Sequence, residues 1–119
     1  MAQIKEEYVS FETAKLLREK GFGIPVKRGV SINGLNLVVE EPENMNEGLS
    51  AYCSQPTQQV AMRWLREVKH LYIMVDFNFS RYKYKIFSSK GLLASTYYVC
   101  ATYELAVEDA IKYCLTNLI

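Results

Sequence analysis

The sequence predicts an α+β fold in which an antiparallel sheet of four or five strands carries three helices, packed mainly on one of its faces. Two observations lead to this class. Three amphipathic stretches, each preceded by a Ser or Thr that can cap a helix, lie near the start, in the middle and at the end of the chain. Between them, apolar and polar residues alternate in segments that short turns can join as hairpins. The expected order is α-β-β-α-β-β-(β)-α, and hairpin connections favour antiparallel pairing.

The chain has 119 residues, half of them apolar, which is enough for one domain with its own core and too few for two. We therefore predict a single compact domain over residues 1–119. The formal net charge of +1 gives no overall field that would attract nucleic acid or an acidic membrane. The longest strongly apolar run, LYIMV, is too short for a bilayer span, and the start MAQIKEEYVS lacks an apolar signal region. We expect a cytoplasmic protein without membrane contact.

The first helix is expected over residues 11–20. Ser10 is its predicted N-cap, because its hydroxyl can accept a hydrogen bond from an unpaired amide of the first turn. Gly21 supplies the left-handed residue that ends the helix, and Phe22 can fold back onto Leu17.

Two strands are expected next, near residues 26–32 and 35–40. The pair Asn33-Gly34 between them is typical of a type I′ hairpin turn, in which both central residues have positive φ. The following EEPENMNEG is acidic and rich in turn residues, so we predict a mobile acidic loop near residues 40–54.

The second helix is expected in PTQQVAMRWLREVK, with Thr57 as its N-cap. Trp64, the only tryptophan of the chain, lies in the middle of its apolar stripe, so we interpret it as a core anchor. The members of that stripe are Val60, Ala61, Trp64, Leu65 and Val68. Arg63 and Arg66 then point outward.

A second hairpin is expected in LYIMVDFNFSRYKYKIFSS, and its first strand shows a row of apolar residues at alternate positions: Leu71, Ile73, Val75, Phe77 and Phe79. A further strand is expected within residues 95–101. The third helix begins after the predicted N-cap Thr102 and turns a second apolar stripe to the core. That stripe comprises Val107, Ala110, Ile111, Cys114, Leu115 and Leu118.

Several chemistries find no support in the sequence. No glycine-rich phosphate-binding spacing occurs. The single histidine, His70, ends the second helix, where a structural role is favoured. The three cysteines are far apart and lack the paired spacing of zinc sites, so we expect reduced, mostly buried thiols. We predict a protein that is not an enzyme and needs no cofactor or metal.

The charge is unevenly distributed, because residues 63–90 contain seven basic side chains and two acidic ones. Lysines interleaved with aromatic rings on an open sheet face are typical of proteins that bind single-stranded nucleic acid, although an ordinary half-solvated sheet has the same composition. The residues assigned to a candidate interaction or nucleic-acid surface are Tyr72, Arg81, Lys83, Lys85, Phe87, Arg63 and Arg66.

Three blocks, YVSFETAKLLREKGF, PTQQVAMRWLREVKHLYIMV and YELAVEDAIKYCLTNLI, cover about half of the chain. On these blocks the chain resembles a recurrent group of small uncharacterised bacterial proteins that are often associated with prophages or other mobile elements. The resemblance implies a compact intracellular α+β domain of unknown function and supplies no catalytic residues.

Our leading hypothesis is a non-catalytic interaction module that binds an unknown protein partner or associates with itself, through an exposed sheet face or edge. It rests on the missing catalytic constellation and on 15 Trp, Tyr and Phe residues, more than a small core readily buries. The less favoured alternative is a single-stranded nucleic-acid-binding module that uses the basic aromatic hairpin of residues 71–88.

Overall fold

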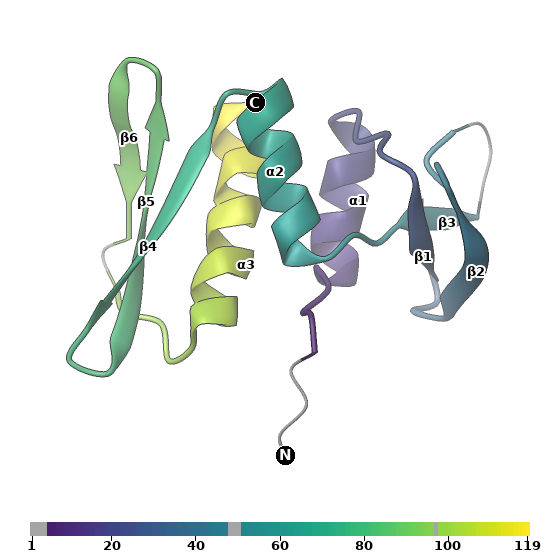
Figure 1. Ribbon diagram of the computed structural model, residues 1–119, viewed down its shortest axis with the longest axis horizontal. Coiled ribbons are helices and arrows are strands. Elements are labelled where there is room, and N and C mark those ends of the chain that lie inside the picture. Colours follow the sequence, from purple (N-terminus) through teal and green to yellow (C-terminus); the bar gives the residue numbers. More distant parts are fainter. Residues whose placement is uncertain (1–4, 48–50, 97) are drawn as a thin grey trace.

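The computed structural model describes residues 5–47, 51–96 and 98–119. Helices α1, α2 and α3 form a middle layer, and a three-stranded antiparallel sheet lies on either side of it (Figure 1). The first sheet has the strand order β2-β1-β3, and the second has the order β4-β5-β6. The elements in chain order are α1 Phe11–Glu19, β1 Val26–Ser31, β2 Asn36–Glu43, β3 Tyr52–Ser54, α2 Gln58–Val68, β4 Tyr72–Asn78, β5 Arg81–Ser88, β6 Gly91–Ser95, α3 Tyr103–Tyr113 and the π-helical turn η1 Cys114–Leu118.

The predicted α+β class and its three helices are confirmed, whereas the single sheet of four or five strands is wrong. Within the described part of the chain, six strands form two separate sheets instead. The physical reason is that the helical layer has apolar surface for both. α1 contacts β3 of the first sheet, while α2 and α3 contact β4 of the second. Each sheet can therefore bury one face against the helices without pairing with the other sheet.

The predicted helix boundaries are confirmed by their capping contacts. The Ser10 side chain accepts a hydrogen bond from an amide of the first turn of α1. Gly21 has a φ of 92°, and the Phe22 N–H bonds to the Leu17 carbonyl at 2.9 Å, which closes the helix in a Schellman-type end. The side-chain caps predicted for the other two helices are also present, at Thr57 and Thr102.

The first hairpin has a different turn from the one predicted. The Ser31 N–H bonds to the Leu35 carbonyl at 2.9 Å, so three residues rather than two form the loop. Gly34 has a positive φ of 79°, whereas Asn33 does not, which excludes a type I′ turn. A three-residue loop that ends in a left-handed glycine is the next most common hairpin connection.

The acidic loop predicted near residues 40–54 is shorter than expected. β2 continues to Glu43 opposite Val26, with an irregularity in the register, and β3 occupies Tyr52–Ser54. The acidic side chains remain compatible with a strand because they are exposed at the edge of the first sheet. Residues 48–50 of the predicted loop lie outside the described residues, and its mobility stays a prediction.

Trp64 lies in the core, as predicted, with 3% of its surface exposed. Its ring meets the ring of Phe22 edge-on, with 5.5 Å between the centroids. The prediction for Val68 is wrong, because it is 52% exposed in the last turn of α2. The three thiols are free and buried: Cys53, Cys100 and Cys114.

Candidate interaction surface

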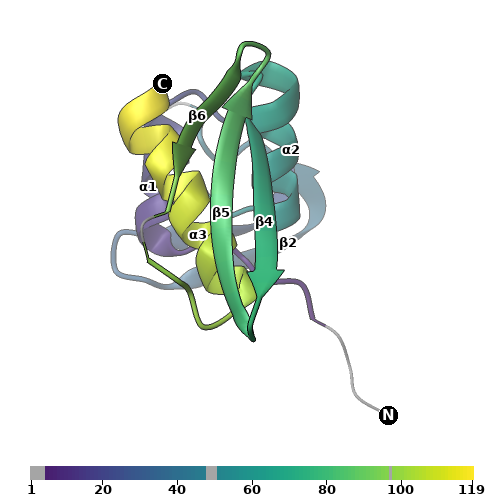
Figure 2. The same cartoon turned by 90° about the vertical axis from the view of Figure 1, so that its left-hand side faces the viewer.

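The register of β4 and β5 sorts their side chains onto two faces of the second sheet. Val75 opposite Tyr84 and Ile73 opposite Ile86 belong to the inner face, which packs on the helices. The side chains between them point the other way, onto the outer face. Figure 2 shows that no helix lies in front of this outer face. The residues that the register places there are Tyr72, Met74, Asp76, Asn78, Arg81, Lys83, Lys85 and Phe87.

This outer face has two chemically different ends. At one end Tyr72, Met74, Phe87 and Leu92 form what we call the apolar half, since Phe87 pairs with Tyr72 on one side and with Leu92 on the other. Leu92 is 56% exposed. At the other end, toward the β4–β5 turn, the side chains are charged or polar. We call this end the basic half, and it comprises Asp76, Asn78, Arg81, Lys83 and Lys85.

The basic half carries more positive than negative charge. Its one carboxylate, Asp76, lies 3.9 Å from the ammonium nitrogen of Lys85, in a pair whose side chains are about half exposed. Such an exposed pair contributes little to stability. Arg81 and Lys83 form no ion pair with any of the described residues. Two cations are therefore available to an anionic ligand.

The segment after β6 forms a wall beside the basic half. The Thr96 N–H bonds to the Tyr84 carbonyl at 3.1 Å, and Cys100 exchanges two backbone hydrogen bonds with Tyr82. Beside these anchors lies a groove of about 520 Å³, and its lining includes Asp76, Phe79, Arg81, Lys83, Thr96 and Val99.

The strand predicted within residues 95–101 lies earlier than expected, at Gly91–Ser95. The tip of the β4–β5 hairpin also differs from the prediction, which placed Phe79 in the apolar row of the strand. Phe79 and Ser80 instead form the turn, with positive φ values of 51° and 62°. The Phe79 side chain is 92% exposed, because a turn residue beyond the last strand pair has no core to pack on.

Arg63 and Arg66 do not join the outer face. Both lie on α2, which packs in the helical layer behind the second sheet (Figure 1). Arg63 forms an ion pair with Glu67, four residues along the helix, at 3.0 Å. The structure therefore brings together five of the seven predicted surface residues: Tyr72, Arg81, Lys83, Lys85 and Phe87.

The position of β6, as an uncharged strand at an edge of the sheet, is a feature that sequence reasoning missed. The strand forms an edge of the second sheet, and its sequence GLLAS contains no charged residue. Leu92 and Leu93 are 56% and 46% exposed. The sequence signal that could have located it is the turn-prone stretch SSKG at residues 88–91. In the structure Gly91 has a φ of 121° and the Lys90 N–H bonds to the Ser88 hydroxyl.

A second hollow, of about 500 Å³, lies between β6 and α3. The Tyr98 hydroxyl donates a hydrogen bond of 2.5 Å to the Asp109 carboxylate. That bond and the negative charge of the carboxylate raise the pKa of Tyr98 to about 12. Burial and the same carboxylate also raise the pKa of Tyr84. These groups satisfy one another, which fits a role in joining β5 and the segment after β6 to α3.

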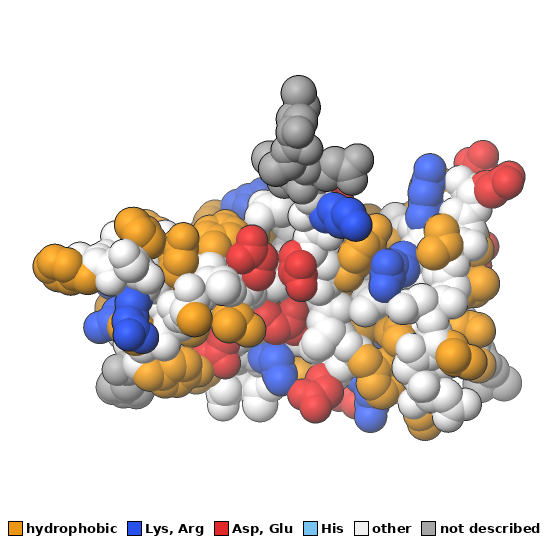
Figure 3. Space-filling model, turned by 90° about the horizontal axis from the view of Figure 1, so that it is seen from below, with side chains coloured by type: hydrophobic (Ala, Val, Ile, Leu, Met, Phe, Trp, Pro, Cys, Tyr) orange, Lys and Arg blue, Asp and Glu red, His pale blue; other side chains and the backbone are white. Residues whose placement is uncertain are grey.

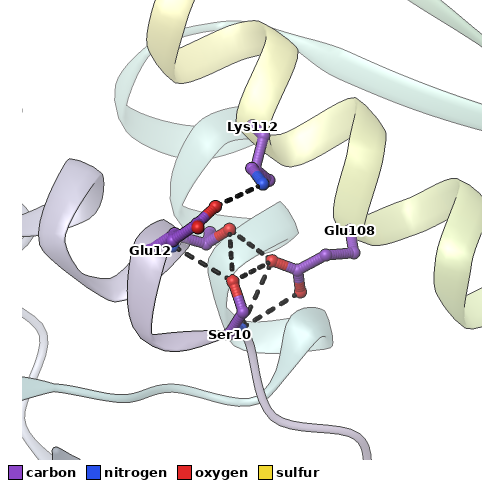
Figure 4. A network of polar contacts seen from close by, with 5 residues as sticks. Ser10, Glu12, Glu108 and Lys112 are labelled. Atoms are coloured by element: carbon purple, nitrogen blue, oxygen red, sulfur yellow. Dashed lines mark hydrogen bonds and ion pairs between the residues drawn. The ribbon is translucent and has the colours of Figure 1, made fainter. Parts of the chain in front are cut away.

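Glu108 of α3 is the centre of a polar network at the start of α1 (Figure 4). Its carboxylate accepts hydrogen bonds from the backbone N–H and the hydroxyl of Ser10 and from the hydroxyl of Thr13. Beside it, Lys112 forms an ion pair with Glu12 at 2.8 Å. All of these contacts join α1 to α3, so we assign the network a structural role.

The acidic side chains of this region are separate from the basic half. Figure 3 shows acidic groups, with some basic ones among them, in the middle of this face, and it shows basic and hydrophobic groups at the end formed by the second sheet. A shallow hollow beside the network is lined by Glu7, Glu104 and Glu108. The carboxylates of this hollow would repel an anionic ligand, whereas the cations of the basic half would attract it.

Within the described residues, no three His, Cys, Asp or Glu side chains are grouped so that they could hold a metal ion. No helix in the same part of the chain is long and apolar enough to cross a bilayer. The chain matches no family model, no curated protein and no solved structure.

Proposed function

We propose that the protein is a non-catalytic interaction module that associates with a second copy of itself by pairing β6 with β6. The observation that carries this proposal is the unguarded edge of the second sheet. An edge strand presents unpaired N–H and C=O groups, and proteins that must avoid pairing cover or charge such edges. β6 has no charged residue and exposes two leucines.

The two edge strands of the first sheet differ from β6 in charge or in length. β2, at one edge, carries Glu40, Glu41, Pro42 and Glu43. Negative charge and proline are both common means of preventing a strand from pairing with another chain. β3, at the other edge, has only three residues. β4, the other edge of the second sheet, contains Asp76, so among the edge strands of the described residues only β6 combines an uncharged sequence with exposed leucines.

A two-fold axis beside β6 would join the two second sheets into one sheet of six strands. Antiparallel pairing is self-complementary, as a two-fold interface requires, and it places no like charges opposite one another because β6 has none. The apolar halves of the two outer faces would then be continuous through the two Leu92 side chains. The alternative partner is an unknown protein other than a second copy. This alternative rests on the resemblance to proteins of mobile elements.

Light scattering after size-exclusion chromatography, over a range of protein concentrations, tests this function. We expect a dimer for the natural chain and a monomer for Leu92→Lys/Leu93→Lys, since lysines protect edge strands. Val38→Lys is the matched control, because Val38 is 71% exposed on β2 and should leave the dimer intact. A monomer at every concentration would contradict the proposal, as would a dimer unaffected by the β6 substitutions.

A second candidate function is the binding of single-stranded nucleic acid by the basic half. The observation that favours it is the register, which places Arg81, Lys83 and Lys85 on one open face. Aromatic rings and cations on such a face can stack bases and neutralise phosphates. The two functions use different halves of the outer face and are compatible.

Binding of fluorescent oligothymidylate at several salt concentrations tests this second function. Lys83→Glu/Lys85→Glu should weaken binding and reduce the slope of log K against log salt by about 1.4, since each phosphate contact to a single strand contributes about 0.7. The control is Lys5→Glu/Lys27→Glu, which makes the same change of charge at exposed positions away from this face. Equal effects of the two variants would refute a local site.

A further inference from the structure

We propose that the groove at the hairpin tip is a subsite for one nucleotide of a single strand, with the base against the ring of Phe79 and a phosphate on Arg81 and Lys83. This inference rests on the second candidate function and makes its site specific. It combines two independent observations, which are the backbone and exposure of Phe79 and the composition of the groove beside it.

Phe79 occupies a position that is unfavourable in two respects. A bulky residue with a positive φ is a conformational outlier, and in this hairpin both turn residues have one. The ring is also 92% exposed to water, and it takes part in none of the aromatic pairs among the described residues. Outliers of this kind concentrate at binding sites. The positive φ values belong to the two-residue hairpin turn itself, but a partner from outside the chain would account for a bulky, exposed ring at a position that usually holds Asn or Gly.

The groove beside Phe79 has the size and the charge for a nucleotide. Its volume of about 520 Å³ lies within the usual range for small-ligand sites. Arg81 and Lys83 can make charge-assisted hydrogen bonds to a phosphate, and neither has a carboxylate partner among the described residues. Thr96 and Val99, which follow β6, also line the groove.

Asp76 restricts how the ligand can lie in the groove. Its carboxylate would repel a phosphate but can accept hydrogen bonds from the amino groups of a base. The phosphate therefore belongs with Arg81 and Lys83, and the base belongs between Asp76 and Phe79. Stacking on the tip ring requires an unstacked base, so the subsite should select a single strand over a duplex.

The same ring and cations could also enter the headgroup region of an anionic membrane, which the experiment must separate from nucleic acid. The groove favours the nucleotide, because its polar lining includes Asp76 and Asn78, which can form hydrogen bonds to a base. A membrane surface would not use these groups. Vesicles that contain phosphatidylglycerol are therefore a second probe beside oligothymidylate.

Substitutions of Phe79 test the subsite. Phe79→Ala should weaken oligothymidylate binding about 10-fold, within the range for one lost base stack, and should leave the salt slope unchanged because the ring carries no charge. Phe79→Trp should retain the affinity, and its emission should be quenched by the oligonucleotide. The buried Trp64 gives the background signal, which the natural chain measures. Phe77→Ala is the matched control, since Phe77 is 64% exposed on the inner face of the same tip.

The outcomes distinguish the nucleotide subsite at Phe79 from nucleic-acid binding by the basic half in general. If the natural chain binds oligothymidylate and Lys83→Glu/Lys85→Glu weakens binding, but Phe79→Ala binds like the natural chain, the subsite is refuted and the nucleic-acid function stands. If the natural chain does not bind single strands, both are refuted. A response of Phe79→Trp to the vesicles alone would replace the nucleotide by a membrane, and binding that prefers a duplex would also overturn the subsite.

Discussion

The carboxylate of Glu108 in α3 accepts hydrogen bonds from both the backbone N–H and the hydroxyl of Ser10, the N-cap of α1. A helix end that lacks such partners leaves amides unsatisfied. Here a residue near the end of the chain caps a helix near its start. The contact therefore joins α1 to α3 within the helical layer on which both sheets pack.

Glu108→Ala should lower the free energy of unfolding by about 1.5 to 3 kcal/mol, the range for hydrogen bonds to a charged group. The Thr13 hydroxyl, which is buried, would lose its bond to the carboxylate. Urea denaturation followed by circular dichroism measures the change. Glu104→Ala, an exposed site on the same helix, should change stability by about 0.5 kcal/mol or less. Equal effects of the two would contradict the role of the network.

Trp64→Ala should cost about 3 to 5 kcal/mol, because it removes the ring that packs on Phe22 in the core. That is a large part of the total stability of a small domain. Thermal unfolding should show a strongly lowered Tm or no cooperative transition. Arg63→Ala, which breaks only an exposed ion pair in the same helix, is the control. A folded Trp64→Ala protein of natural stability would show that the ring is not a core anchor.

Phe79→Asn/Ser80→Gly should stabilise the protein by about 1 kcal/mol, since Asn-Gly adopts two successive positive φ values with little strain. The nucleotide subsite predicts that the same change weakens oligothymidylate binding. A gain in stability with a loss of binding is the usual trade-off at a strained site. Parallel urea titrations and binding curves measure both. A loss of stability would show that the turn is not strained.

The pair of Glu12 and Lys112 predicts a pH dependence. The hydrogen bond and charge of Lys112 lower the pKa of Glu12 from its usual 4.5, and Glu12 raises the pKa of Lys112 from its usual 10.5. The depressed pKa gives stability that is present above pH 4.5 and lost as pH falls through the lower folded value. The raised pKa gives stability that is present below pH 10.5 and lost as pH rises through the higher folded value.

Glu12→Gln tests this dependence, because it removes the charge and leaves the shape. The difference in Tm between the natural chain and the variant should be constant near neutral pH and should shrink on acidification below about pH 4.5, where Glu12 of the unfolded chain becomes protonated. It should vanish below the lower folded pKa, where Glu12 is protonated in both states. A difference that stays constant to pH 2 would show that the ion pair does not contribute.

Local features were predictable from the sequence where one residue type has one physical role. Ser10, Thr57 and Thr102 cap helices because their hydroxyls can accept amide bonds, and Gly21 ends α1 because it tolerates a positive φ. The alternation in the second hairpin also placed the residues of the outer face together, because side chains along a strand have a period of two.

The division into two sheets was not predictable in this way, since it depends on which helix faces cover which strands. β3 and β6 are short, with three and five residues, so their alternation is too brief to recognise. Phe79 was misplaced because its turn contains no glycine, the usual sign of a tight hairpin. The groove depends on a segment far from Phe79 in sequence, so no local pattern predicts it.

The most direct test of the central claim, that β6 pairs with a second copy, is amide hydrogen exchange of residues 91–95 at low and high protein concentration. The proposal predicts that the amides of β6 that face away from β5 are protected at high concentration and exchange freely on dilution, while the amides of β2 do not respond. Exchange in β6 that is the same at both concentrations, in a protein that light scattering shows to dimerise, would place the interface elsewhere and contradict the account.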